Sequence, residues 1–191
     1  MVNMRPFTAF EQKNLKFLVN HNVKFTQVEI TPTGLGKGIL DSTAPMRAYF
    51  LENGIHNYEG QLQGQEHKQI KQACILTDAT QFFTKASFYR PNTKKGDPRM
   101  WIYGFGSYTE GNDIHVLFWH EQTLYSINIT HIDIEKCYNS AIITPMQEVL
   151  KAINKEGNSV SEELLGRFRA VKDQWFESEV TADTGIGRTI E

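Results

Sequence analysis

The first hydrophobic pattern along the chain is helical. Thr8 and Glu11 have the spacing of a capping box, and apolar residues follow them at partly helical intervals. These apolar positions are Phe10, Leu15, Leu18 and Val19. We therefore expect a short helix over residues 8–20. A second short helix is expected over residues 44–52, because APMRAYFLE is followed by Asn53 and Gly54, a pair typical of a helix C-terminus.

The pattern of the intervening segments is that of short β-strands. Strands are predicted over residues 23–30, 70–76, 82–89, 101–108, 114–119 and 124–129, and the last two predict a hairpin across residues 120–123. Residues 58–68 are polar and glutamine-rich, which indicates an edge strand or a loop. Six or seven short strands with few helices between them favour a small barrel or half-open barrel over a parallel, doubly wound sheet.

The pattern changes again after residue 129. A helix is predicted over residues 145–155, and a break at residues 156–159 precedes a second helix that extends to about residue 176. This second helix has one apolar face, which is typical of a connector or packing helix. Its apolar positions are Leu164, Leu165, Phe168, Val171 and Trp175. The last residues, TADTGIGRTIE, begin a further segment.

Length and composition fit a soluble domain with a hydrophobic core. The chain has 191 residues, of which 40% are hydrophobic and 12% aromatic. It lacks an apolar run of the ~20 residues that a membrane span needs, so we expect a soluble, cytoplasmic protein with no membrane partner. Cys74 and Cys137 have no CxxC partner, and the six histidines form no HExxH motif. We therefore expect reduced thiols and no metal site.

Charge is divided unevenly along the chain, although the net charge is only −2. Residues 1–104 carry 13 basic and 8 acidic side chains, whereas residues 105–191 carry 7 and 14. Within the basic part, residues 85–99 hold five cations against one carboxylate, Asp97. Such a dense basic segment on a mildly acidic chain indicates a local contact with an anionic partner.

This basic segment lies inside FYRPNTKKGDPRMWIYG, residues 88–104, whose interior is rich in turn formers. We expect a cationic loop between two strands. An arginine can form paired hydrogen bonds with guanine and a carboxylate can accept one from cytosine, while lysines suit phosphate contacts. The alternative is a solvated charged hairpin in which Asp97 pairs with Arg99 or Lys95.

A glycine-rich segment, PTGLGKG at residues 32–38, is the second candidate loop. It matches neither the P-loop pattern GxxxxGK[ST] nor GxGxxG at the start of a helix. It offers a flexible, closely approachable backbone and one cation, Lys37. Two interpretations remain: a plain connection from a strand to a helix, or an arm that faces the cationic loop.

Together, PTGLGKGILD at residues 32–41 and FYRPNTKKGDPRMWIYG resemble the N-terminal effector DNA-binding domain of EcoRII-type restriction endonucleases, which is related to the plant B-three domains. The resemblance covers residues 20–130. It implies a mainly β fold with flanking helices: a seven-stranded open pseudobarrel whose two DNA-gripping arms enter the major groove. It also implies sequence-specific binding of double-stranded DNA at a short CC(A/T)GG-like site.

The same resemblance implies a set of DNA-binding residues. Lys37 falls on the first arm, and Lys95, Asp97 and Arg99 fall on the base-reading set of the second. The full set implied is Gly36, Lys37, Arg90, Asn92, Lys94, Lys95, Asp97, Arg99 and Trp101. One position departs from the family pattern, because Pro98 stands where the family carries another cation.

The tail TGIGRTIE, residues 184–191, resembles the entry to the nuclease domain of the MvaI/BcnI-like group, with Glu191 as its active-site glutamate. This implies the N-terminal part of a prokaryotic type II, IIE-like restriction endonuclease. Residues 1–140 would bind DNA, 141–180 would be a helical connector and 181–191 would begin a truncated nuclease domain. We expect no catalytic residue or cofactor in the DNA-binding domain; a C-terminal nuclease domain would be its partner and would use Mg²⁺.

Two alternatives of other classes remain. Glu66-His-Lys68 has the ExK form of a metal-dependent nuclease, with Glu52 or Glu59 as a further ligand. The chain would then be a nuclease in its own right. Alternatively, Trp101, Tyr103 and Tyr108 would form a stacking surface of a single-strand nucleic-acid-binding or protein-binding module.

Overall fold

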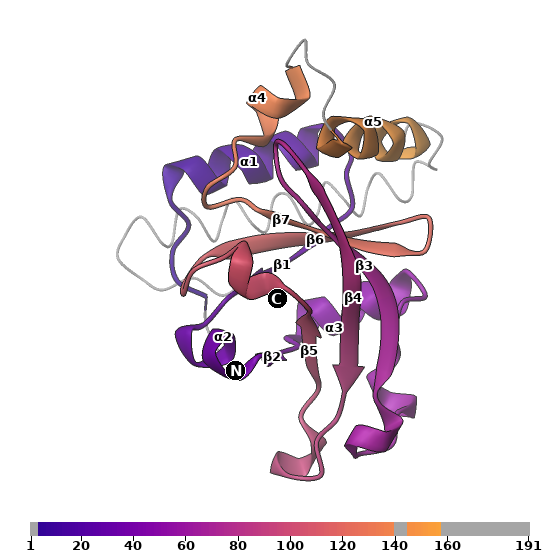
Figure 1. The fold of residues 1–191 in the computed structure, drawn as a ribbon. Helices are drawn as coiled ribbons and strands as arrows, with labels where there is room; N and C mark the ends of the chain where they lie inside the picture. The colour runs from indigo at the N-terminus through magenta and orange to yellow at the C-terminus, as the bar shows by residue number, and fades with distance from the viewer. Residues whose placement is uncertain (1–3, 140–144, 158–191) are drawn as a thin grey trace. The chain divides into compact units, whose positions relative to one another are not determined.

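The computed structural model describes residues 4–139 and 145–157 of the chain (Figure 1). Their contacts divide them into two units, each with its own interior. The first unit takes in residues 4–24, 76–81 and the described residues from 129 onward. The second unit takes in residues 25–75 and 82–128, and it contains every residue predicted to bind DNA.

A seven-stranded mixed sheet forms an open half-barrel, and this confirms the predicted fold class. The strands follow the order β1-β6-β7-β3-β4-β5-β2 (Figure 1). They are β1 (Thr26–Glu29), β2 (Leu40–Asp41), β3 (Gln69–Leu76), β4 (Gln81–Tyr89), β5 (Arg99–Ile102), β6 (Ile114–His120) and β7 (Thr123–Asn128). The strands β1 and β2 lie at the two ends of this order, so the barrel remains open between them.

The core of the second unit lies between this sheet and helix α3 (Ala44–Glu52), which begins and ends where the sequence predicts. Phe50 of α3 packs edge-on against Phe88 of β4, with ring centroids 5.2 Å apart. The hydroxyl of Tyr49 accepts a hydrogen bond of 2.9 Å from the backbone amide of Trp119 in β6. The helix is therefore fixed to the sheet by both apolar and polar contacts.

Two segments differ from the predictions, the β6–β7 turn and the strand predicted over residues 101–108. That strand, β5, ends at Ile102 and is followed by a 3-10 turn, η4 (Phe105–Ser107). The β6–β7 hairpin turns on two residues, Glu121 and Gln122, both with positive φ angles (45° and 65°), as a type I′ turn requires. The strands consequently run up to His120 and from Thr123, two residues that were predicted to be part of the turn. The glutamine-rich segment is a loop containing two short 3-10 turns, η1 (Tyr58–Gly60) and η2 (Gln65–His67), and not an edge strand.

Within the first unit the described helices are α1 (Ala9–Asn20), α4 (Ile134–Asn139) and α5 (Pro145–Gly157). Asn14 of α1 donates to the backbone oxygens of Ile129 and Ile132, at 2.8 and 2.7 Å, and so ties α1 to the chain before α4. The helices predicted over residues 8–20 and 145–155 are observed. The helix predicted over residues 159–176 and the nuclease-like tail lie outside the described residues.

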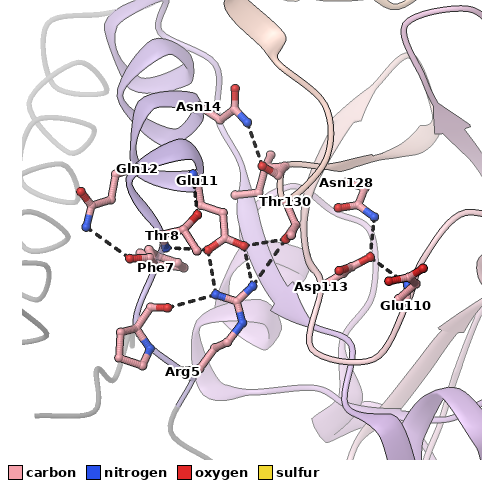
Figure 2. Close-up of polar contacts among 12 residues, drawn as sticks. Arg5, Phe7, Thr8, Glu11, Gln12, Asn14, Glu110, Asp113, Asn128 and Thr130 are labelled. Carbon is pink, nitrogen blue, oxygen red and sulfur yellow. Dashed lines mark hydrogen bonds and ion pairs between the residues drawn. The ribbon is translucent and has the colours of Figure 1, made fainter. Parts of the chain in front are cut away.

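A buried carboxylate organises the start of α1 (Figure 2). Glu11 is fully buried, and it accepts hydrogen bonds from the guanidinium of Arg5, from the hydroxyl of Thr130 and from the amide of Thr8. Thr8 in turn accepts from the amide of Glu11, which completes the predicted capping box. Burial acts to raise the pKa of Glu11, but these hydrogen bonds outweigh it, so the pKa lies below its ordinary value of 4.5.

The second unit has a comparable buried cluster around Asp113 (Figure 2). The carboxylate of Asp113 accepts from the side-chain amide of Asn128, at 2.9 Å, and from the backbone amide of Glu110, at 2.8 Å. These bonds close the predicted turn at residues 110–113 before β6. Among the residues that the structure describes, no helix is both long and apolar enough to cross a membrane.

Candidate nucleic-acid interface

Two connecting segments flank the same short stretch of sheet in the second unit. We call residues 32–38, which precede β2, the first arm, and residues 90–98, which connect β4 to β5, the second arm. The strands β2 and β5 pair with each other, with Leu40 opposite Met100 and Asp41 opposite Arg99. The amide of Ser42 donates to the backbone oxygen of Pro98 at 2.9 Å. The pairing of β2 with β5 therefore brings both predicted arms to one region.

The first arm is a short helix, α2 (Pro32–Lys37), whereas the sequence predicted a flexible loop. Thr31 caps it by accepting a hydrogen bond of 3.0 Å from the amide of Gly34, and Pro32 takes the first helical position. Gly38 ends the helix with a φ of +66°, which glycine adopts without strain. As a result, Gly36 and Lys37 are exposed on a defined turn of helix.

Trp101 lies beneath the first arm and is half-buried. Its ring meets Phe105 edge-on, with centroids 5.3 Å apart. A methyl group placed on Gly38 would lie 3.7 Å from Trp101 ring atoms, so the end of α2 approaches this ring. Trp101 was predicted as a DNA-binding residue, and its position in the structure indicates that it supports the first arm.

The second arm contains a left-handed turn at its tip. Three consecutive residues have positive φ angles: Lys94 (51°), Lys95 (57°) and Gly96 (71°). The amide of Gly96 donates to the oxygen of Thr93 at 2.9 Å, and this bond closes the turn. Left-handed backbone costs an L-residue with a side chain about 1–2 kcal/mol, so two lysines in this state need support from the surrounding structure.

The exposed tip of this arm carries four of the nine predicted DNA-binding residues. Asn92, Lys94, Lys95 and Asp97 are all exposed. Asp97 follows the turn directly, so the carboxylate and the two ammonium groups are presented within four residues of chain. A surface of this kind can contact phosphates and also offers both donors and an acceptor to base edges.

Arg90 lies at the base of the second arm, where its side chain binds backbone. Its Nε donates to the oxygen of Gly96 at 2.9 Å, and its Nη1 donates to the oxygen of Gln61 at 3.1 Å. The amide of Gly64 donates to the oxygen of Arg90 at 2.8 Å. Arg90 was predicted to contact DNA, and in the structure two of its donors are used inside the protein.

Arg99 also lies on the sheet and not at the tip. Its side chain is only 15% exposed, and its Nε is 3.9 Å from the carboxylate of Asp41. The Nε is buried without a hydrogen-bond acceptor. Asp41 thus pairs loosely with Arg99, in place of the Asp97–Arg99 pair that the alternative interpretation of the sequence considered.

A buried tyrosine fixes the backbone at Arg99. The hydroxyl of Tyr58 donates to the oxygen of Arg99 at 2.9 Å and therefore accepts from the hydroxyl of Ser42, at 2.6 Å. Burial raises the pKa of Tyr58, with smaller opposing effects from the Ser42 hydrogen bond and the charge of Arg47. The phenol consequently remains a donor throughout the physiological range, and the strand that carries Arg99 is held in place.

Asp41 and Tyr89 lie beside the predicted residue Arg99, and the sequence analysis did not assign either of them to this site. The strand register places Asp41, Arg99 and Tyr89 side by side on β2, β5 and β4. The ammonium group of Lys68 lies 5.1 Å from the centre of the Tyr89 ring, a cation–π contact. Alternation along β4 and β5 could have placed Tyr89 and Arg99 on one face, but nothing in the sequence pairs them with Asp41 on a two-residue strand.

The ExK segment of the nuclease alternative does not form a strand. Glu66 and His67 belong to the 3-10 turn η2, and Glu66 is exposed. Lys68 contacts the ring of Tyr89, as described above. Among the described residues, no three His, Cys, Asp or Glu side chains are grouped as metal ligands would be. The turn therefore does not bring Glu66 and Lys68 together as a buried strand of a nuclease site would.

The aromatic residues of the stacking alternative have different environments. Tyr103 is 39% exposed, while Tyr108 is half-buried and its ring lies 5.4 Å from that of Phe82. Trp101 packs against Phe105. Of the three predicted stacking residues, Tyr103 is exposed and the other two are half-buried, while Phe82 and Phe83 of β4 are also exposed.

Comparisons with known proteins give no match: no family model matches this chain, and no curated protein or solved structure is significantly similar to it.

Proposed function

We propose that the second unit binds double-stranded DNA in a sequence-specific manner through the major groove, with the first and second arms as the contacting elements. The observation that carries this proposal is the left-handed turn of the second arm, which holds Lys94 and Lys95 exposed beside Asp97. The side chains support the two tasks of such a protein, because lysines bind phosphates and the mixed donor and acceptor groups suit base edges. Lys37 adds a cation on the first arm.

The resemblance to EcoRII-type effector domains extends this proposal. We infer that the chain is the target-recognition part of a type II restriction endonuclease that acts at a CC(A/T)GG-like site. The open half-barrel and the positions of the two arms on it support this inference, because the resemblance implied both. In the intact enzyme, DNA bound here would regulate or tether a C-terminal, Mg²⁺-dependent nuclease domain. The chain itself would perform no catalytic step.

Binding titrations at two salt concentrations test the proposal. The 191-residue chain is titrated with a duplex that contains CC(A/T)GG and with a duplex of shuffled sequence. We expect tighter binding to the first duplex and a logarithm of the binding constant that falls linearly with the logarithm of salt concentration, because lysines at the arms displace counterions from phosphates. Failure to bind any duplex at low ionic strength would contradict DNA binding. Equal binding to both duplexes would contradict this target site.

A further inference from the structure

The left-handed turn at the tip of the second arm needs contacts that stabilise it. Lys94 and Lys95 are both in a backbone state that residues with side chains rarely occupy, and both side chains are exposed. Exposed side chains supply no packing that would favour this state. Support must therefore come from contacts to the backbone of the turn.

The side chain of Arg90 supplies such contacts. Its guanidinium spans two backbone oxygens, that of Gly96 inside the turn (2.9 Å) and that of Gln61 on another segment (3.1 Å). Because the donor is charged, each bond is stronger than one between neutral groups. We call residues 61–64 the brace. The brace contacts the arm a second time, because the side chain of Gln63 lies against Gly96, where an added methyl group would come within 2.6 Å of it.

The brace is itself anchored in the interior of the second unit. The side-chain amide of Gln61 is buried and donates to the oxygens of Phe88 and His67, each at 2.9 Å. Its amide oxygen is 2.9 Å from Nε2 of His56, which therefore carries the proton. The ring of His56 stacks on that of Phe88, with centroids 5.1 Å apart. A continuous chain of contacts therefore runs from the core to the turn.

We propose that Arg90 is a positioning residue that locks the second arm, through the brace, in its left-handed form before any ligand arrives. The effect on DNA binding rests on the proposed function. The locking of the arm by Arg90 does not depend on that function. The arm would then present Lys94, Lys95 and Asp97 without an ordering cost on binding, and preorganisation of this kind raises affinity. Arg90 would contribute nothing to the counterion term, because it contacts no phosphate.

Two measurements on the 191-residue chain separate positioning from contact. The first is amide hydrogen exchange without DNA at Gly64 and Gly96. The amide of Gly64 donates to the backbone oxygen of Arg90 and so joins the brace to the arm, and the amide of Gly96 closes the turn. The second is duplex affinity across a series of salt concentrations, for the CC(A/T)GG-containing and shuffled duplexes. The variants are Arg90→Ala, Arg90→Lys and, as a matched control at the exposed tip, Lys94→Ala.

For Arg90→Ala we expect exchange at Gly64 and Gly96 to accelerate about tenfold or more, with the thermal midpoint nearly unchanged. Affinity for the CC(A/T)GG duplex should fall about tenfold, with the same salt slope and a smaller preference over the shuffled duplex. Arg90→Lys should behave like Arg90→Ala, because an ammonium group cannot span both oxygens. Lys94→Ala should leave exchange unchanged and lower the salt slope by about 1.

Three results would overturn the inference: unchanged exchange at Gly64 and Gly96 in Arg90→Ala, a salt slope lowered by about 1 in that variant, or restored affinity in Arg90→Lys. The last two would make Arg90 a phosphate contact. A wild-type chain that binds no duplex would refute the proposed function alone, and hydrogen exchange would still decide whether Arg90 locks the arm.

Discussion

Lys94 and Arg99 lie at different depths of the candidate interface. Lys94 is exposed at the tip of the second arm, whereas the side chain of Arg99 is 15% exposed and lies beside Asp41 on the sheet. A duplex that contacts both must therefore reach past the tip of the arm to the surface of β5. In the proposed complex the exposed lysine would meet phosphates first, and the arginine would contact only a duplex that reaches the surface of β5.

Substitutions at Lys94 and Arg99 should distinguish a phosphate contact from a base-specific contact. We expect Arg99→Ala to cost about 1–3 kcal/mol of binding to the CC(A/T)GG duplex and to reduce discrimination at one base pair, because a paired arginine–guanine contact is lost. Lys94→Ala should weaken binding to all duplexes alike, as a phosphate contact does. Titration of duplexes with single base-pair changes measures both. An equal loss on cognate and shuffled duplexes for Arg99→Ala would count against base reading.

Glu11 in the first unit gives a prediction about acid stability. Its pKa in the folded protein is lowered, so the unfolded chain takes up the proton first as pH falls. The stability contributed by its charge is fully present above the unfolded value near 4.5 and is lost as pH falls through the lower folded value. Glu11→Gln, which keeps the capping box, should destabilise the protein by about 1.5–3 kcal/mol at pH 7.

The difference in unfolding free energy between wild type and Glu11→Gln should therefore shrink below pH 4.5. Urea unfolding at pH 7 and at pH 3 to 4 measures it. A difference that is constant across this range would show that the charge of Glu11 does not contribute. Thr8→Ala is the control, because it removes the other half of the capping box without removing a charge, and its effect should not depend on pH in this way.

Some side-chain contacts followed from local sequence and others did not. The spacing of Thr8 and Glu11 predicted a capping box because both partners lie within one turn of helix. The turn formers in residues 88–104 predicted a loop with exposed cations. The contact of Arg90 with Gln61 joins segments 29 residues apart, and the same side chain donates to the oxygen of Gly96, which follows Lys94 and Lys95. A contact between segments so far apart cannot be predicted from a local sequence pattern.

Among the secondary-structure elements, the helix α2 of the first arm was not predicted from the sequence. Thr31, Pro32 and Gly38 are suitable cap, first-turn and terminal residues, so the signals for a helix were present. Two glycines within six residues lower the helix propensity enough to suggest a flexible loop. Packing of the helix end against Trp101 supplies the stabilisation that the propensity lacks. The hairpin at Glu121 and Gln122 is similar, because neither residue is typical of a type I′ turn.

Two glycines of the first arm offer a matched pair of substitutions. Gly38→Ala should destabilise the second unit by about 1 kcal/mol, because alanine is strained at a φ of +66°. Gly36→Ala should be neutral or stabilising by about 0.5–1 kcal/mol, because its added methyl group meets open space and alanine favours helix. Urea unfolding measures both. Equal effects at the two positions would contradict the helical form of the first arm.

At the scale of the molecule, the strand order brings the two arms together. The arms are about 50 residues apart in sequence. The first arm leads into β2 and the second arm leads into β5, so the pairing of β2 with β5 places the two arms close together. The number of strands and the open barrel were predictable from the alternation of hydrophobic residues and from the resemblance. The exact pairing was not, because β2 has only two residues and hence almost no pattern of its own.

This arrangement predicts which nucleic acids will compete for the site. Exposed side chains on two arms can enter the major groove of B-form DNA, which is about 12 Å wide, whereas the major groove of A-form RNA is too narrow and deep for side chains to read. A single strand offers no groove. We therefore expect a labelled CC(A/T)GG duplex to be displaced efficiently by unlabelled duplex of the same sequence, and poorly by the single strand or by the equivalent RNA duplex.

Competition at two salt concentrations makes this test specific, because all three competitors carry phosphates. At low salt, non-specific attraction lets every competitor displace some of the labelled duplex. At higher salt that attraction weakens, and only the DNA duplex should remain effective if the arms need a wide major groove. If the single strand competes as well as the duplex, an aromatic surface that includes Tyr103 becomes the better explanation, and Tyr103→Ala should then abolish the competition.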